Sequence, residues 1–258
     1  APDSILGEYT KKLGEEKAAK TLERPSLPAL NIWFKESGKL TKKFKNSTKR
    51  DQLGLILIDR YPIRDEEVNA IRAHHIKFED GVYFIDATRS PKSKDSQGVP
   101  GMAKNKGTKE GRTIYLPTAF AQQLQKLGAK NPTKKLFPNF SAKVTAALKT
   151  IPGFEGVKTA AYKRQIVTFA GTDEVGLTPQ ERSAFNLMAG HAMDAGSLTE
   201  ADKSIIKLYE NRQDRKTLFE IQKRALGKIA IAREKLEKGQ LGKFEETFIE
   251  GIKAPGFT

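Results

Sequence analysis

The chain has 258 residues, of which 38% are hydrophobic and 30% charged, enough for one large globular domain or two small ones. It holds no cysteine, which excludes disulfide bonds, thiolate metal sites and a cysteine nucleophile. Its 46 lysine and arginine residues against 31 acidic ones give a formal net charge of +15, which favours a polyanionic partner. Charge alone leaves open a basic soluble protein with another role, such as a ribosome-associated factor.

Further features limit the class of protein. The longest apolar run, residues 53–58, is far too short to cross a membrane, and no signal-peptide stretch opens the chain. We therefore expect an intracellular protein, in cytoplasm, nucleoid or nucleus, with no membrane partner. The three histidines, His74, His75 and His191, lack metal-ligand spacing, so we expect no metal site. The chain begins at Ala1 rather than Met, as expected of a fragment or a trimmed chain.

The N-terminal quarter is charged and rich in lysine. Residues 1–24 predict one charged helix, which Pro25 and Pro28 interrupt, and an apolar patch follows at 30–34. The run 39–50 indicates a loop or a solvated helix end that can contact phosphates. The lysines that we expect to bind nucleic acid there are Lys42, Lys43 and Lys45.

Two helices and a small sheet are expected next. The apolar run 53–58 predicts a buried helix that extends back through Arg50 and stops before Pro62. A second helix is predicted from about Asp65 to His74. Alternation at 76–78, the turn signal Asp80-Gly81, and the runs 82–85 and 113–116 then predict three antiparallel strands. The stretch 90–110 between the last two strands is a long basic hairpin loop, which carries Lys104, Lys106 and Lys109.

Everything after Pro117 predicts helix. Helices are expected at 118–127, 141–150 and 158–170. Two more should begin at capping signals, the capping box Thr178-Pro179-Gln180-Glu181 and the weaker pair of Thr199 and Asp202. The last follows an apolar stripe that ends near residue 237. The fold class is therefore α+β and mostly helical. We divide the chain into an N-terminal helical and basic segment (1–47), a catalytic domain (48–212) and a C-terminal helical tail (213–258).

Five side chains along this order can carry chemistry. Arg64 opens a helix, Lys106 lies on the hairpin loop, Arg164 is on a helix, His191 follows a helix end, and Tyr209 lies among aliphatic residues. Each has an ordinary explanation when taken alone: a surface ion pair, a solvated lysine, a surface charge, a helix cap and a core tyrosine. Taken together, they could clamp a phosphodiester, protonate a leaving oxygen and attack phosphorus.

In this order the patches resemble the catalytic domain of tyrosine recombinases, the phage integrase family, over roughly residues 48–212. The matching motifs are Arg64-Asp65-Glu66-Glu67-Val68 for the first arginine box, Asn105 to Ile114 for the hairpin lysine, Leu136-Phe137-Pro138 before the second arginine, Ala189-Gly190-His191, and the downstream Tyr209. Two departures stand out. Ala161 occupies the place of the histidine in the family's H-x-x-R box, with Tyr162 and Lys163 as nearby substitutes. His191 and Tyr209 are about twice as far apart as usual, which fits an insertion around 196–204.

The resemblance implies a site-specific recombinase that cleaves and rejoins DNA through a 3′-phosphotyrosine. Arg64 and Arg164 would hold the scissile phosphate, His191 would hydrogen-bond it, Tyr209 would attack it, and Lys106 would protonate the 5′ oxygen. No cofactor is needed, and the partners would be double-stranded DNA and three further copies of the chain in a tetramer. Lys163 would add a DNA contact.

Several alternatives stay open. The protein could be a topoisomerase of type IB, which relaxes DNA as a monomer, or a DNA-binding protein that keeps the fold without catalysis. The striped helix after residue 213 could pack on its own chain or be exchanged between protomers. Residues 1–47 are too short for the N-terminal clamp domain of most family members, so that domain is missing here or the protein clamps DNA differently.

Overall fold

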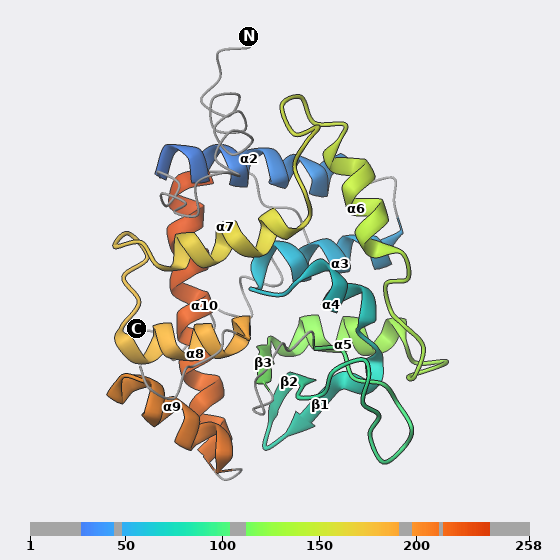
Figure 1. Cartoon of the computed structure of the whole chain (residues 1–258), viewed down its shortest axis with the longest axis vertical. Coiled ribbons are helices and arrows are strands. Elements are labelled where there is room, and N and C mark those ends of the chain that lie inside the picture. Colours follow the sequence, from blue (N-terminus) through green and yellow to red (C-terminus); the bar gives the residue numbers. More distant parts are fainter. Residues whose placement is uncertain (1–26, 44–47, 104–111, 191–197, 212–213, 238–258) are drawn as a thin grey trace.

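A computed structural model describes residues 27–43, 48–103, 112–190, 198–211 and 214–237. The described chain is mostly helical, with one small sheet (Figure 1). Its elements are α2 (Leu27–Lys43), α3 (Lys49–Arg60), α4 (Asp65–Ala70), the 3-10 turn η3 (Ala73–His75), β1 (Ile76–Glu79), β2 (Val82–Ala87), β3 (Arg112–Leu116), α5 (Thr118–Leu127), α6 (Phe140–Leu148), α7 (Ala160–Ala170), α8 (Pro179–Ala189), α9 (Glu200–Glu210) and α10 (Arg215–Glu237). The predicted α+β class is confirmed, and the predicted helix at 1–24 lies outside the described residues.

The sheet is three-stranded and antiparallel in the order β1-β2-β3, as predicted. Asp80 and Gly81 both have positive φ, which the tight turn between β1 and β2 requires. Helix α5 packs on β1 and β2, whereas α8 and α10 pack on β3. The side chains of β3 are buried throughout, so this strand lies inside the molecule rather than at its surface.

The helix predicted to run from Asp65 to His74 is shorter than expected. It ends at Ala70, because Ile71 is extended and its carbonyl accepts the Leu136 N–H at 2.9 Å. The Ile71 carbonyl thus pairs with the distant 135–136 segment instead of accepting a hydrogen bond from the next turn of a helix. Residues 73–75 form only a 3-10 turn before β1 begins.

Helices α8 and α9 begin where capping predicts. The Thr178 hydroxyl accepts the Glu181 N–H at 3.2 Å, and Thr199 accepts the Asp202 N–H at 3.1 Å. In each case the acidic side chain accepts the N–H of the capping threonine in return. These two boxes satisfy amide groups that the first turn of a helix would otherwise leave unpaired.

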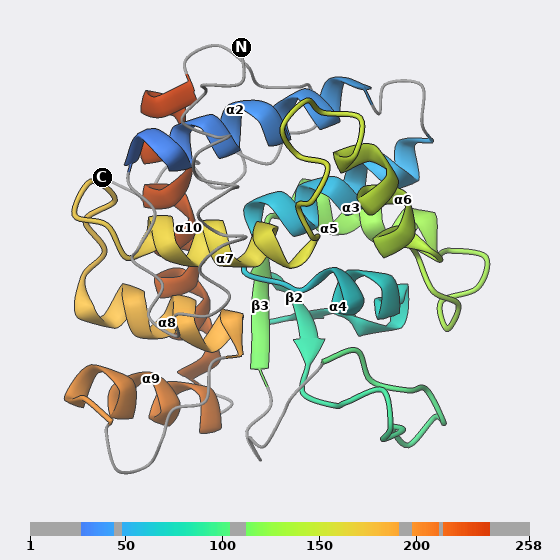
Figure 2. The same cartoon turned by 45° about the horizontal axis from the view of Figure 1, so that its top comes forward.

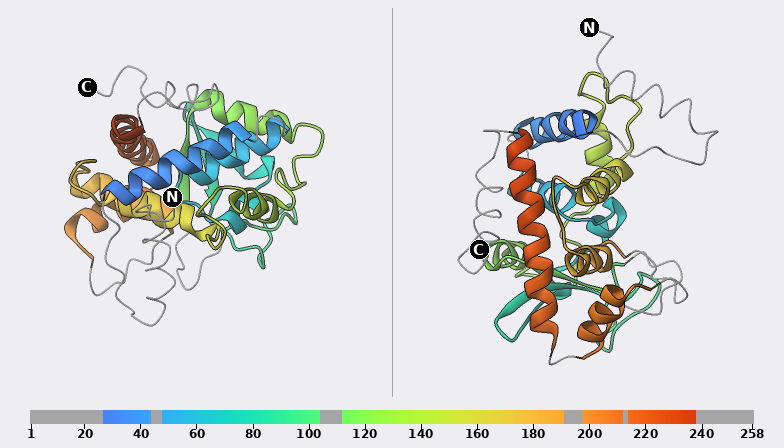
Figure 3. Two further views of the ribbon diagram at one scale, coloured as in Figure 1. Left: turned by 90° about the horizontal axis from the view of Figure 1, so that it is seen from above. Right: turned by 90° about the vertical axis from the view of Figure 1, so that its left-hand side faces the viewer.

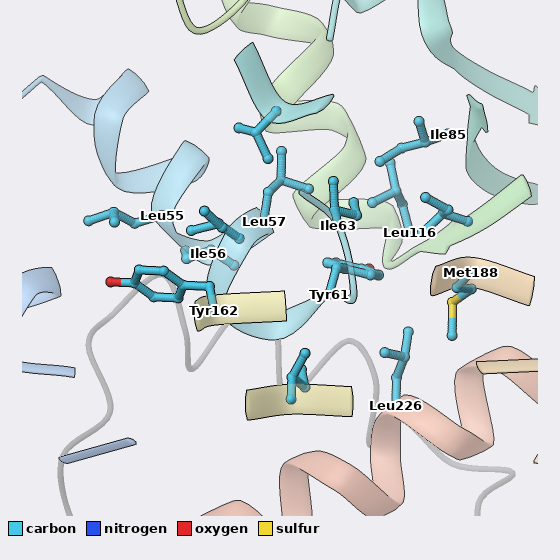
Figure 4. Packing of buried hydrophobic residues seen from close by; sticks show 14 of the residues in the cluster. Leu55, Ile56, Leu57, Tyr61, Ile63, Ile85, Leu116, Tyr162, Met188 and Leu226 are labelled. Carbon is cyan, nitrogen blue, oxygen red and sulfur yellow. The ribbon is translucent and has the colours of Figure 1, made fainter. Parts of the chain in front are cut away.

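One hydrophobic core joins most of the described elements, including helices on both sides of the 48–212 range. Trp33 of α2 stacks on Phe154 with ring centroids 5.3 Å apart, and Phe219 of α10 stacks on Phe84 of β2 at 4.9 Å. Side chains from α3, β2, β3, α7, α8 and α10 meet in its centre (Figure 4). Figure 3 shows α10 running along the molecule, with α2 lying across its C-terminal end.

Two buried polar residues fix α10 on its own chain. The Gln222 amide donates to the Thr113 carbonyl and accepts the Tyr115 N–H, both at 3.0 Å, so it occupies the outer edge of β3 as a neighbouring strand would. The Arg233 guanidinium donates to Asp59 Oδ2 at 2.7 Å and lies over the Phe34 ring at 4.3 Å. None of the helices in the described part of the chain combines the length and apolar character that crossing a bilayer requires.

Candidate phosphate-binding pocket

Arg64 lies at the N-cap of α4, where the chain leaves the Pro62 bend. Its backbone N–H donates to Glu67 Oε2 at 2.9 Å, which holds the first turn of α4 closed. Its side chain is exposed and lines a pocket of about 380 Å³. The first turn of α4 also brings two acidic residues to the pocket wall, Asp65 and Glu66.

Arg164 lines the same pocket from α7. The spacing of the α7 contributors places them on one face of the helix; they are Ala160, Lys163, Arg164, Val167 and Thr168. The pocket therefore brings together Arg64 and Arg164, two residues that lie 100 positions apart in the chain. Figure 2 shows one end of α7 close to α4, where the two helices line the pocket. The C-terminal end of α8 contacts β3.

The charge of the pocket wall is mixed with a cationic excess. Three side chains carry a positive charge, Arg64, Lys163 and Arg164, against the carboxylates of Asp65 and Glu66. An arginine guanidinium donates several N–H groups in a plane and binds phosphate oxygens in pairs. Two exposed guanidinium groups in one pocket therefore suit an oxyanion with more than one free oxygen.

Lys163 is half-buried beside the end of α8. Its Nζ donates to the Ala189 carbonyl, one of the groups that the last turn of a helix leaves without a partner. Burial lowers the pKa of Lys163 to about 8, while nearby Glu67 raises it and Arg112 and Arg64 lower it further. This ammonium is thus held among other cations in a partly desolvated place.

Behind the pocket lies a buried ion pair. Arg112 Nη2 donates to Glu67 Oε2 at 2.6 Å, and both side chains are almost completely buried. The guanidinium also packs against Gly190, which caps α8 in a left-handed conformation with φ of 64°. A Cβ at residue 190 would collide with Arg112, so glycine is required both by φ and by space.

Neither Glu67 nor Arg112 was assigned a role from the sequence, although both belong to the motifs. The signal for Arg112 is its place at the start of the apolar run 113–116, because an arginine that is buried together with such a strand needs an acidic partner. Through Arg112, the pair links the end of the hairpin loop, the start of α4 and the residue before His191.

Several predicted site residues lie outside the described residues. They are Lys106 and His191 among the catalytic set, and Lys45, Lys104 and Lys109 among the DNA contacts. Lys42 and Lys43 fall in the last turn of α2. The structure therefore places Arg64, Arg164 and Lys163 together and leaves the positions of those five open.

Tyr209 is not among the described residues that line the pocket. It lies near the end of α9, against a small cluster made of Ala184, Leu187, Ile205, Leu218 and Ile221. The Arg215 guanidinium lies over its ring at 5.8 Å from the centroid. Tyr162, a neighbour of the missing histidine, is fully buried against Trp33, which excludes it from the pocket.

Fold and pocket define a mostly helical α+β protein with a cationic pocket between α4 and α7. Comparisons with protein-family models, curated proteins and solved structures find no match to this chain. Among the described residues, no three histidine, aspartate or glutamate side chains converge where they could hold a metal ion.

Proposed function

We propose that this protein cleaves and rejoins double-stranded DNA as a tyrosine recombinase, through a 3′-phosphotyrosine intermediate. The observation that supports this best is that Arg64 and Arg164 line one pocket, as two residues that grip the same phosphate must. The net charge of +15 supports a polyanionic substrate.

In the proposed reaction, Arg64 and Arg164 bind the non-bridging oxygens of the scissile phosphate and stabilise the added negative charge of the transition state. The Tyr209 phenol loses its proton to water as its oxygen forms a bond to phosphorus, and the bond from phosphorus to the 5′ oxygen breaks. Lys106 protonates that leaving oxygen, and His191 hydrogen-bonds the phosphate. Rejoining reverses these steps, so the phosphotyrosine conserves the bond and no nucleotide cofactor is consumed.

The buried pair of Glu67 and Arg112 has a positioning role in this scheme. Because it links the start of α4 with Gly190, it fixes the distance between Arg64 and the backbone that leads into His191. The scheme also requires Tyr209 to leave its cluster and reach a phosphate on DNA, in its own chain or a neighbouring one. Recombination would use four copies of the chain on two duplexes.

A second candidate is a DNA-binding protein that does not cut. Two observations favour it: Tyr209 packs in a cluster separate from the pocket, and Ala161 provides no acid or base where the family that the sequence resembles has histidine. In that case Arg64 and Arg164 still bind a backbone phosphate, and no covalent step follows.

A nicked duplex pool with a randomised core tests both candidates, because strand cleavage next to a nick releases a short end and traps the covalent complex. The full chain should form a denaturant-resistant adduct, and Tyr209→Phe should abolish it. The matched control Tyr83→Phe, which alters a half-buried tyrosine of β2, should keep it. An adduct that survives in Tyr209→Phe contradicts the nucleophile assignment.

DNA binding without any adduct supports the second candidate instead. A supercoiled plasmid in the same experiment separates recombination from simple relaxation. A monomer that relaxes the plasmid without site preference would indicate the topoisomerase alternative.

A further inference from the structure

Lys163 occupies a junction between the pocket and the end of α8. It lies on the face of α7 that lines the pocket, one residue before Arg164. Its Nζ donates to the Ala189 carbonyl, so the ammonium is fixed rather than free to swing into solvent. An ammonium has three N–H donors, and the described hydrogen bond uses one of them. As far as the described residues go, two donors therefore remain for a ligand in the pocket.

The groups around Lys163 come from four elements. Arg64 and Glu67 face it from α4, Arg112 from β3, and the Ala189 carbonyl from α8, while Arg164 is its neighbour on α7. Glu67 is engaged by Arg112 at 2.6 Å and by the Arg64 backbone at 2.9 Å. Asp65 and Glu66 line the same pocket, so among the described groups four cations, Arg64, Arg112, Lys163 and Arg164, stand against three carboxylates. A bound anion would relieve the repulsion that remains between the cations.

We propose that Lys163 is the third cation of the site, donating to an oxygen of the DNA phosphate held by Arg64 and Arg164, and that binding there depends on its protonation. This inference rests on the proposed phosphodiester role of the pocket. Ala161 occupies the place of the family's histidine, and Tyr162 is buried away from the pocket. Lys163 would then be the titrating group beside the phosphate.

The direction of the pH effect follows from the charge. The pKa of Lys163 is about 8 in the free protein, so the ammonium is charged at neutral pH and neutral in mild alkali. A phosphate bound beside it favours the charged form and raises that pKa. Affinity is therefore constant below about pH 7 and falls above the free pKa, by up to about tenfold per pH unit while only the bound form stays protonated.

The experiment measures binding of the full chain to a fluorescent duplex oligonucleotide from about pH 7 to about pH 9.5 at constant ionic strength. The wild-type affinity should fall across this range, while Lys163→Arg should bind with nearly constant affinity, because a guanidinium stays charged. Lys163→Met should be weak at every pH and should reduce the salt dependence of binding by about one phosphate contact.

Two comparisons exclude other causes. The terminal amine also titrates near pH 8, but it is present in both wild type and Lys163→Arg, so their difference isolates Lys163. Lys158→Met removes an exposed lysine that precedes α7 and does not line the pocket, and it should retain the wild-type pH profile. Thermal unfolding of each variant checks that it is folded.

Identical pH profiles for wild type and Lys163→Arg, with binding intact, overturn the role of Lys163 and leave the proposed function standing. If the folded wild type does not bind duplex DNA at neutral pH, both the role of Lys163 and the proposed function are overturned.

Discussion

The Arg112 guanidinium and the Glu67 carboxylate form an ion pair of 2.6 Å that is almost completely buried between β3 and α4. Glu67 also accepts the Arg64 N–H, and Arg112 packs against Gly190. One ion pair thus connects the arginine at the pocket wall with the turn that leads to His191. Its loss should affect both stability and the pocket.

Replacing Glu67 with alanine should lower the free energy of unfolding by about 3 kcal/mol, because it leaves the Arg112 charge buried without its partner. The pKa of Lys163 should also fall below about 8, since Glu67 is the group that raises it. Chemical denaturation and a pH titration of Lys163 check the two effects. Glu200→Ala, which removes an exposed ion pair with Lys203, should change stability far less.

A second prediction concerns Gly190. Gly190→Ala should destabilise the protein through both the left-handed φ and the collision with Arg112. The matched control is Gly98→Ala, where φ is also positive, at 75°, but where a Cβ would meet nothing within 4 Å. Equal losses of unfolding free energy in the two variants would show that the Arg112 contact contributes nothing.

The anchoring of α10 can be tested at Arg233. Arg233→Met should cost about 3 kcal/mol of stability, because the buried Asp59 carboxylate loses the guanidinium at 2.7 Å and keeps only the more distant Arg60 Nε at 3.7 Å among its described ion pairs. Lys216→Met, at an exposed position on the same helix, should be nearly neutral. If α10 instead packed on its own chain only loosely and were exchanged freely, the two variants would unfold alike.

Stability should depend on pH through His75. Burial lowers the pKa of His75 to about 4 from an ordinary value of 6.5, so the folded state binds the proton more weakly than the unfolded state. The neutral ring accepts the Arg72 N–H at Nδ1, and Nε2 lies 3.0 Å from the Pro100 carbonyl. The stabilisation is therefore complete above pH 6.5 and is lost progressively as the pH falls toward 4, by about 3 kcal/mol in all.

The check is unfolding by denaturant across this pH range. His75→Asn removes the titrating ring and should flatten the dependence, although its stability at neutral pH will be lower. A variant that keeps the full wild-type slope between pH 6.5 and 4 would assign the effect to another group.

The local elements were predictable from the sequence, because their signals are local. The capping boxes at Thr178 and Thr199, the Asp80-Gly81 turn and the alternation in β1 all produced the expected structures. The predicted end of α4 was wrong, because the hydrogen bond between Ile71 and Leu136 that ends the helix joins segments far apart in sequence. No local pattern contains that contact.

The candidate site was predictable only in part, for the same reason. Motif order pointed to Arg64 and Arg164, but their meeting in one pocket depends on how α7 packs beside α4. Lys163 was expected to contact DNA and was named with Tyr162 as a nearby substitute for the missing histidine. Its hydrogen bond to Ala189 and its lowered pKa follow from burial against α8, which a single sequence does not reveal.

A double-mutant cycle on Arg64 and Arg164 tests most directly whether the two arginines bind one phosphate. The affinity of the full chain for duplex DNA is measured for wild type, Arg64→Met, Arg164→Met and the double variant. A shared phosphate predicts that the double variant loses less affinity than the sum of the single losses, with a coupling of about 0.5–3 kcal/mol. Losses that add to within about 0.5 kcal/mol would mean that the two arginines act on separate groups and would contradict the proposed site.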